Sequence, residues 1–286
     1  MLPLSFVILT FNEERDLPRC LESLRDVSDD VAVLDSGSTD NTVAIAESYG
    51  CRVYNHAFTG FGDQRNWAID NIPGRYEWTF HLDADERITP ALCQEIGTVL
   101  EQTQSEAGFY IANKLMLGKH WLRYSSGYPV YQVRLFHRDR LRFENYGHGQ
   151  REITQGRLGK LREPYLHFAF SKGLDHWLEK HIQYSHKEAD QASCSRHSVW
   201  KELGGLASSP SERRRSLKQI SHRLPFRPTM RLLYTLLWQR GVLDGRAGIT
   251  YARLLALYES MTKLHTVWKK LQIDEDQADE TSVQGR

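Results

Sequence analysis

Three carboxylates stand within four residues in the stretch FHLDADERI, residues 80–88, where Asp83, Asp85 and Glu86 follow a run of strand-forming residues. Like charges this close raise one another's pKa and cost stability, unless a cation or a chemical task offsets the repulsion. The spacing therefore indicates a functional role for these carboxylates. The alternative is an exposed strand end followed by a helix cap.

The elements that must position this cluster alternate between short apolar runs and helical patterns. Strand patterns cover residues 4–10, 30–36, 51–58 and 77–86, and helical patterns cover residues 13–26, 39–50 and 62–72. Such alternation predicts an α/β fold with a doubly wound, mainly parallel sheet. Ligands of these sheets lie beyond the carboxyl ends of the strands.

Polar residues follow the predicted strand ends and should converge on one edge of the sheet. They are Thr10, Asn12 and Glu13 after the first strand, Asp35 after the second, and Asp83 and Asp85 after the fourth. By itself, the stretch DSGSTDNT, residues 35–42, is more typical of a turn followed by a helix cap than of a ligand contact. That interpretation leaves Asp35 unexplained, because Asp35 precedes the cap.

Several protein classes are disfavoured. The glycine fingerprint of dinucleotide-binding enzymes is absent after the first strand, where TFNEER stands. The Asp-x-Asp of aspartate-nucleophile phosphatases would need Thr or Val at the position of Arg87, and would close the first strand instead of the fourth. The four cysteines form no Cys-x-x-Cys pair, which favours a reducing cytosol over a zinc site or disulfide framework. We expect neither a signal peptide nor a membrane-spanning segment.

Four motifs in order resemble the family-two inverting glycosyltransferases, which have the A-type nucleotide-sugar fold. The motifs are VILTFNEE, VLDSGSTDNT, GDQRNWAI and LDADE, within about the first 90 residues. The subgroup that includes lipopolysaccharide-core glucosyltransferases is similar through GHGQRE, YLHFAFSKGLDHWLEKHIQYS and GVLDGRAGITYARLLALYE. The resemblance therefore implies an A-type glycosyltransferase sheet, followed here by a C-terminal helical extension.

The resemblance implies a role for each matching residue on the donor side. Asp35 would accept the imide N–H of uracil, and the segment from Thr10 through Asn12 to Glu13 would line the base and ribose. Arg65 would lie near the base or the diphosphate. Asp83 would reach the ribose or a metal-bound water, and Asp85 would ligate Mg²⁺ or Mn²⁺ bridging the phosphates. Glu86 is left out of this metal site, because it can instead pair with Arg87 or cap the following helix.

An inverting transfer also needs a base that removes the proton of the acceptor hydroxyl. The family often carries it in a His-Glu pair, but here His148 and Glu152 are separated by three residues in NYGHGQREIT. We predict Glu152 as the base, with His148 as a supporting residue or weaker candidate. The alternative is a surface hairpin in which Glu152 pairs with Arg151 or Arg157.

The middle of the chain holds aromatic and histidine residues without an assigned role. Trp121, Tyr124, Tyr128 and Tyr131 suit either acceptor sugars or cross-strand packing, and Arg134 or His137 suits phosphate. The histidines at positions 167, 176, 181 and 186 do not share one helical face, so packing and surface roles are favoured over a metal cluster.

The net charge of +1 hides an asymmetry: residues 1–106 hold 7 Lys+Arg against 19 Asp+Glu, a balance of −12, and residues 195–270 hold 15 against 4, a balance of +11. Apolar helical patterns flanked by Arg and Trp in the basic part predict contact with an anionic membrane surface. Packing on the catalytic half and oligomerisation are the alternatives. Nucleic acid is disfavoured because no binding motif accompanies the charge.

These patterns predict four segments. They are a nucleotide-sugar-binding half (1–106), acceptor-side strands with the base (107–170), a basic helical region (171–272) and a disordered acidic tail (273–286). The predicted function is transfer from a nucleotide-sugar donor, UDP-linked by resemblance, to a lipopolysaccharide-core or other glycolipid acceptor. The predicted location is cytoplasmic, on the inner face of the cytoplasmic membrane. The competing hypothesis is a non-catalytic nucleotide-sugar-binding or membrane-associated scaffold of the same fold.

Overall fold

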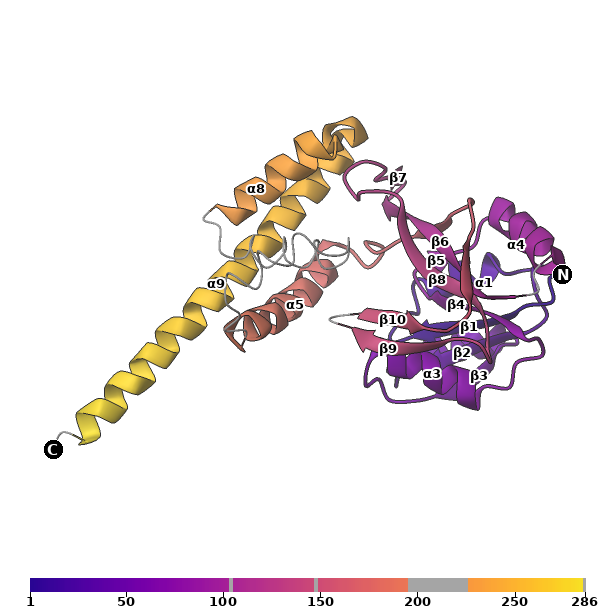
Figure 1. Ribbon diagram of the computed structural model, residues 1–286, viewed down its shortest axis with the longest axis horizontal. Helices are drawn as coiled ribbons and strands as arrows, with labels where there is room; N and C mark the ends of the chain where they lie inside the picture. The colour runs from indigo at the N-terminus through magenta and orange to yellow at the C-terminus, as the bar shows by residue number, and fades with distance from the viewer. Residues whose placement is uncertain (103–104, 147–148, 195–225, 285–286) are drawn as a thin grey trace. The chain divides into compact units, whose positions relative to one another are not determined.

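The computed structural model describes residues 1–102, 105–146, 149–194 and 226–284. The chain divides into two compact units, Met1–Lys172 and Gly173–Arg286, and each is described by itself (Figure 1). The two segments predicted as 1–106 and 107–170 lie in the first unit. Part of the basic segment, residues 195–225, and His148 lie outside the described residues.

The first half of unit 1 is a parallel sheet, as the alternating pattern predicts. Its strands are β1 (Ser5–Thr10), β2 (Val31–Asp35), β3 (Arg52–Asn55) and β4 (Trp78–Asp83), in the order β3-β2-β1-β4. All three neighbouring pairs are parallel. Thr10 lies opposite Asp35, and Leu9 lies opposite Asp83, so the carboxyl ends of β1, β2 and β4 meet at one edge.

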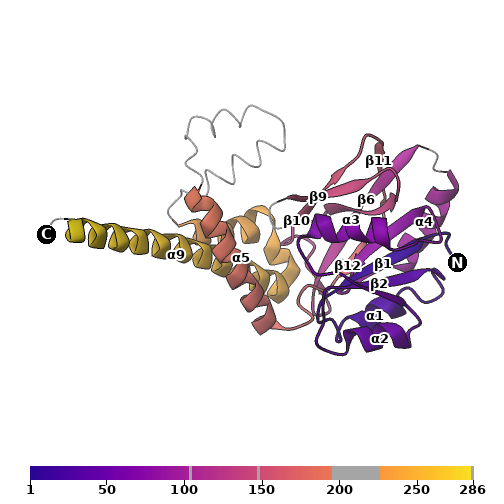
Figure 2. The same cartoon turned by 90° about the horizontal axis from the view of Figure 1, so that it is seen from below.

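Helices cover both faces of this sheet. α1 (Leu17–Glu22), α2 (Thr42–Ser48) and α4 (Pro90–Gln102) cover one face, and α3 (Phe61–Asn71) covers the other. Figure 2 shows α3 on the opposite side of the strands from α1 and α2. The alternation of side chains along β1 explains this arrangement: Phe6 and Ile8 are buried toward α1, and Val7 is buried toward α3.

The second half of unit 1 adds antiparallel strands and makes the sheet mixed. Its members are β5 (Glu86–Arg87), β6 (Glu106–Leu117), β7 (His120–Trp121), β8 (Val130–His137), β11 (Arg157–Lys160) and β12 (Tyr165–His167). The sheet continues from β4 in the order β8-β6-β12-β5, and β6 also pairs with β7 and β11. β8 runs antiparallel to both β4 and β6.

Two further strands form a separate antiparallel ribbon, β9 (Arg142–Tyr146) and β10 (Gly149–Ile153). Within the described residues, neither strand pairs with the main sheet. The ribbon packs near α3 through a small core that includes Ile69, Val133 and Phe143.

Unit 2 is helical. Its elements are α5 (Leu174–Cys194), α8 (Arg227–Leu233), a π-helical turn η2 (Tyr234–Trp238), a 3₁₀ turn η3 (Gly241–Asp244) and α9 (Gly245–Gln284). Figure 1 shows α8 alongside α9. A Cβ at Gly248 would lie 2.1 Å from the carbonyl oxygen of Gly241, so this glycine permits the close approach of η3 to α9.

Two features of unit 2 bear on the sequence predictions. α9 continues to Gln284, so the segment predicted as a disordered tail is helical in the structure. The helices over the described ranges include none that is long and apolar enough to cross a membrane.

Candidate active site

The carboxylate of Asp35 organises the loop that follows β2. It is 1% exposed, and its oxygens accept hydrogen bonds from Thr10 Oγ1 at 2.9 Å, from the backbone N–H groups of Gly37 and Ser38 at 2.9 and 2.7 Å, and from Ser38 Oγ at 2.5 Å. Gly37 has a φ of +90°, a conformation that favours glycine. Asp35 therefore fixes the shape of this loop, a role that the helix-cap interpretation could not explain.

The segment after β1 is bound to the same loop. Asn12 has a φ of 54°; its backbone N–H donates to Ser38 Oγ at 2.8 Å, and its Oδ1 accepts from the N–H of Thr39 at 2.8 Å. The carboxylate of Glu13 pairs with Lys172 at 2.6 Å. Burial raises the pKa of Glu13 to about 7, against the opposing effect of Lys172. The structure thus brings the predicted residues Thr10, Asn12 and Glu13 next to Asp35.

Asp83 lies between two buried arginines. Arg65 from α3 contacts one carboxylate oxygen at 2.9 Å, and Arg134 from β8 contacts the other at 2.7 Å. Both arginine side chains are 2% exposed. Burial alone would raise the pKa of Asp83, but the charges of Arg134 and Arg65 outweigh it and hold that pKa well below its usual value.

Glu86 belongs to the same buried cluster. It is fully buried, forms an ion pair with Arg134, and accepts the backbone N–H of Asp83 at 3.0 Å. Burial raises its pKa to about 7, although Arg134 acts in the opposite direction. The interpretation of Glu86 as a partner of Arg87 or a helix cap is wrong, because its side chain points into the cluster; the Arg87 guanidinium instead lies over the ring of Phe168.

Asp85 is paired with a histidine that sequence reasoning missed. His167 Nε2 lies 3.2 Å from Asp85 Oδ2, and the two side chains are 27% and 26% exposed. Burial lowers the pKa of His167, but Asp85 more than offsets this and raises it to about 9. The helical-spacing argument failed for His167 because this residue lies on β12. His181 and His186 lie on α5, where they stack on Trp177 and His265.

The donor atoms around Asp85 fit a divalent cation in part. Both oxygens of Asp83 are committed to arginines, whereas Asp85 and His167 present a carboxylate and an imidazole side by side. No group of three or more His, Cys, Asp or Glu residues is placed to share an ion in the part of the chain that the structure describes. Asp85 and His167 would therefore hold the ion together with oxygens from a ligand or water.

Glu152 lies on the ribbon and contacts the main sheet through its side chain. Tyr110 Oη on β6 donates a hydrogen bond to Glu152 Oε1. Burial and Glu152 together raise the pKa of Tyr110 to about 12. Glu152 forms no ion pair with another described residue, so the alternative of a surface ion pair with Arg151 or Arg157 is wrong.

The ribbon also connects Glu152 to the donor-side cluster. Gln150 accepts a hydrogen bond from Arg65 Nε at 2.6 Å. Gln150 and Glu152 are two residues apart on β10, so their side chains leave the same face of the ribbon. The predicted base and the Arg65–Asp83 ion pair therefore lie on one side of the ribbon.

The motif GDQRNWAI explains how the ribbon is held. Asn66 exchanges two hydrogen bonds with the backbone of Phe143, at 2.7 and 2.9 Å, and the backbone N–H of Gly62 donates to Asn145 Oδ1 at 2.8 Å. A Cβ at Gly62 would lie 2.6 Å from the carbonyl carbon of Glu144. The motif thus contributes Arg65 to the site and fixes the ribbon that carries Glu152.

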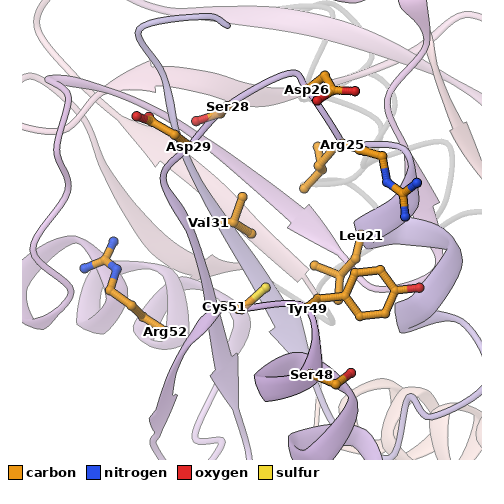
Figure 3. Close-up of a pocket in the computed structure, with 12 residues that line it drawn as sticks. Leu21, Arg25, Asp26, Ser28, Asp29, Val31, Ser48, Tyr49, Cys51 and Arg52 are labelled. Atoms are coloured by element: carbon orange, nitrogen blue, oxygen red, sulfur yellow. The ribbon is translucent and has the colours of Figure 1, made fainter.

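A separate hollow of 640 Å³ lies at the other edge of the sheet (Figure 3). It is lined by residues such as Leu21, Val31, Tyr49 and Arg52, which belong to the ends of α1 and α2 and the beginnings of β2 and β3. None of the twelve residues lining it is a predicted site residue. The candidate site is therefore the carboxyl edge of the strands.

This strand edge, where carboxylates face buried arginines, is the place at which ligands bind in open α/β sheets. Residues 5–157 match the family described as glycosyl transferase family 2. The match covers more than half of the chain, so the chain belongs to glycosyltransferase family 2 and is a glycosyltransferase.

Relatives named as glycosyltransferases match the chain, and two solved structures align with it at low similarity. The chain is 30% identical to the lipopolysaccharide core biosynthesis glycosyltransferase LpsC of Rhizobium meliloti (strain 1021), over 66% of this chain and 72% of that protein. It is 32% identical to the uncharacterized glycosyltransferase RC0292 of Rickettsia conorii, over 40% of this chain and only 39% of that protein. The structure of S. aureus TarS 1-349 aligns with a TM-score of 0.43 and 16% identity, covering 95% of this chain and 92% of that one. Glucosyl-3-phosphoglycerate synthase from Mycobacterium tuberculosis, solved with Mn²⁺ and UDP-glucose, aligns with a TM-score of 0.33 and 21% identity, over 40% of this chain and 43% of that one.

Proposed function

We propose that this glycosyltransferase moves a sugar from a nucleoside-diphosphate sugar, UDP-linked in our hypothesis, to a lipopolysaccharide-core or related glycolipid acceptor, with inversion at the anomeric carbon. The observation that carries the proposal is the link from Asp83 through Arg65 and Gln150 to the ribbon bearing Glu152. This link puts groups suited to a diphosphate and a carboxylate suited to a general base into one connected site.

On the donor side, the loop built on Asp35 would bind the base and ribose, and Thr10, Asn12 and Glu13 would line them. Arg65 would lie beside the diphosphate, where its charge opposes the negative charge that develops on the leaving group. Asp85, with His167, would hold Mg²⁺ or Mn²⁺. Such an ion supplies charge neutralisation to the departing diphosphate.

On the acceptor side, Glu152 would take the proton of the attacking hydroxyl. As that oxygen forms its bond to the anomeric carbon, the bond from this carbon to the diphosphate oxygen breaks, and the nucleoside diphosphate leaves with the electron pair. The hydrogen bond from Tyr110 orients the carboxylate of Glu152.

Glu152→Gln tests the catalytic role against the alternative of a non-catalytic scaffold. Loss of the base should lower kcat by about 100-fold or more, with donor binding retained. The assay is release of nucleoside diphosphate from a panel of UDP-, GDP- and dTDP-sugars with Mn²⁺, beside a thermal-shift measurement of UDP binding. Glu144→Gln, an exposed carboxylate on the same ribbon, is the control. A wild-type chain that binds UDP but releases no product with any donor would favour the scaffold.

The surface of unit 2 supports the proposed lipid-linked acceptor and the proposed membrane location. Its α8–η2–η3 segment exposes Leu237, Trp238 and Leu243, which are 66%, 79% and 61% exposed, and the exposed Arg240 and Arg246 are close to them in the sequence. An apolar surface flanked by arginines suits an anionic bilayer, which would keep a cytoplasmic enzyme at the inner face of the membrane, near lipid-linked acceptors.

Vesicle flotation tests the membrane contact. The full chain should float with phosphatidylglycerol-containing vesicles at low salt, less at high salt, and poorly after Leu237→Ser/Trp238→Ser. Tyr49→Ser, which removes an exposed aromatic residue of the first unit, is the control. Equal flotation of the double variant and wild type would exclude this surface, and a shift of oligomeric state instead would indicate a dimer contact.

A further inference from the structure

One face of β6 carries a row of aromatic and cationic side chains. Alternation along the strand puts Tyr110, Ala112, Lys114 and Met116 on the same face. Tyr131 is paired with Ala112 and Trp121 with Met116, so these rings lie on that face too. We call the set Lys114, Trp121, Arg123, Tyr131 and Lys160 the β6 platform.

The cations of the platform lie against its rings. Lys114 Nζ is 4.7 Å from the centroid of the Trp121 ring, and Arg123 Cζ is 5.4 Å from the same centroid. Lys160 Nζ is 3.8 Å from the centroid of Tyr131. These cation–π contacts hold the charged groups beside flat apolar surfaces. The rings themselves are partly exposed.

The charges of the platform lack ion-pair partners among the described residues. Of the described side chains, no carboxylate forms an ion pair with Lys114, Arg123 or Lys160. This contrasts with Arg65 and Arg134, whose charges are matched by Asp83 and Glu86. Three unmatched cations around aromatic rings are suited to a ligand that combines an apolar face with an anionic group.

The platform shares its face with the contact that orients the proposed base. Tyr110, which donates to Glu152, lies four positions before Lys114 on β6, roughly 13 Å away along an extended strand. An acceptor whose hydroxyl meets Glu152 would therefore extend along β6 toward Lys114 and Trp121. The platform would meet a part of the acceptor beyond the reacting hydroxyl.

We propose that the β6 platform is an acceptor subsite for an anionic sugar, one that bears a carboxylate or a phosphate group. The inference rests on the proposed transfer function and deepens it. The sugar ring stacks on Trp121, and Lys114 and Arg123 bind its anionic substituent. Tyr131 with Lys160 extends the same recognition along the strand. The acceptor is accordingly negatively charged next to the residue that receives the new sugar.

Ligand-observed saturation-transfer NMR on the full chain tests the proposal with defined probes: glucuronate, glucose 6-phosphate and neutral glucose. We expect signals from the anionic probes and weaker signals from glucose. Lys114→Gln/Arg123→Gln should weaken binding of the anionic probes about tenfold, and Trp121→Ala should weaken all three. Lys119→Gln, an exposed cation in the adjacent turn, and Tyr49→Ala, a distant exposed aromatic residue, are the matched controls.

Comparison of the two anions tells which substituent is preferred. Equal signals from glucose and both anions, or equal losses in Lys119→Gln and in the double variant, would overturn the proposal, as would the absence of binding by every probe. The thermal shift produced by UDP with Mn²⁺ is measured on the same variants and should not change. Failure of that shift in the wild-type chain would instead count against the proposed function, so the two failures are distinguishable.

Discussion

Glu86 gives a sharp test of how the buried cluster is ionised. Burial raises its pKa to about 7 in the folded chain from an ordinary value of 4.5. The folded state therefore holds the proton more tightly than the unfolded state. The stability linked to Glu86 is fully present below pH 4.5 and is lost as pH rises through 7. The difference of about 2.5 pKa units corresponds to about 3 kcal/mol in the free energy of unfolding.

Glu86→Gln removes this titration. We expect the stability of wild type, relative to the variant, to fall by about 3 kcal/mol between pH 4.5 and 8. The measurement is urea denaturation at both pH values. The amide of Glu86→Gln accepts hydrogen bonds at one terminal atom instead of two, which lowers the stability of the variant by an amount that does not depend on pH. This amount cancels because only the change of stability with pH is compared. Titration of Glu13 is present in both proteins and also cancels.

The exposed Glu22 supplies the control, since its side chain is 51% exposed and forms an ion pair with the exposed Arg25. Glu22→Gln should alter the pH dependence by less than about 0.5 kcal/mol. If wild type and Glu86→Gln lose stability in parallel from pH 4.5 to 8, Glu86 does not carry the raised pKa. The effect of burial on the pKa of Glu86 would then not outweigh the effect of the Arg134 charge.

Three further results are expected. Tyr110→Phe removes the hydrogen bond that orients the Glu152 carboxylate, so kcat should fall about tenfold while UDP binding is retained; an unchanged kcat would separate Tyr110 from the base. Asp85 raises the pKa of His167 in the folded chain, so wild type in EDTA should be more stable than His167→Gln below pH 6.5, and this difference should shrink as pH rises through 9. Urea denaturation measures the difference, and a difference that does not change with pH would contradict the expectation. Gly62→Ala places a Cβ 2.6 Å from the ribbon backbone and should cost about 1–3 kcal/mol in thermal unfolding while lowering turnover more than UDP binding; unchanged turnover and stability would show that the ribbon tolerates displacement.

The parallel half of the sheet could be predicted from the sequence because its signals are local. Each apolar run is bounded by turn residues, and the polar residues at its carboxyl end follow directly. The loop built on Asp35 is of this kind: all its partners come from the two strand-end segments that the motifs mark. Thr10 and Asp35 thus came together as expected.

The pairing inside the acidic cluster could not be predicted, because it depends on the insertion of β8 beside β4. Arg134 reaches Asp83 and Glu86 from 51 and 48 residues away in the sequence. Nothing in the local pattern distinguishes this arginine from others in the same run. His167 was misjudged for a related reason: its partner, Asp85, is 82 residues away, and the assumption of a helix hid the strand on which it lies.

The ribbon β9–β10 joins the rest of unit 1 through side chains of α3 and β6, without backbone pairing to the main sheet among the residues described. Insertions or substitutions in it leave the ladder of β1, β2 and β4 intact. The strands proposed to serve the donor are therefore held to one another by backbone ladders, whereas the segment proposed to meet the acceptor is held by individual side-chain contacts. Under the proposed function, a substitution in the ribbon would change acceptor binding before it disturbed the parallel sheet.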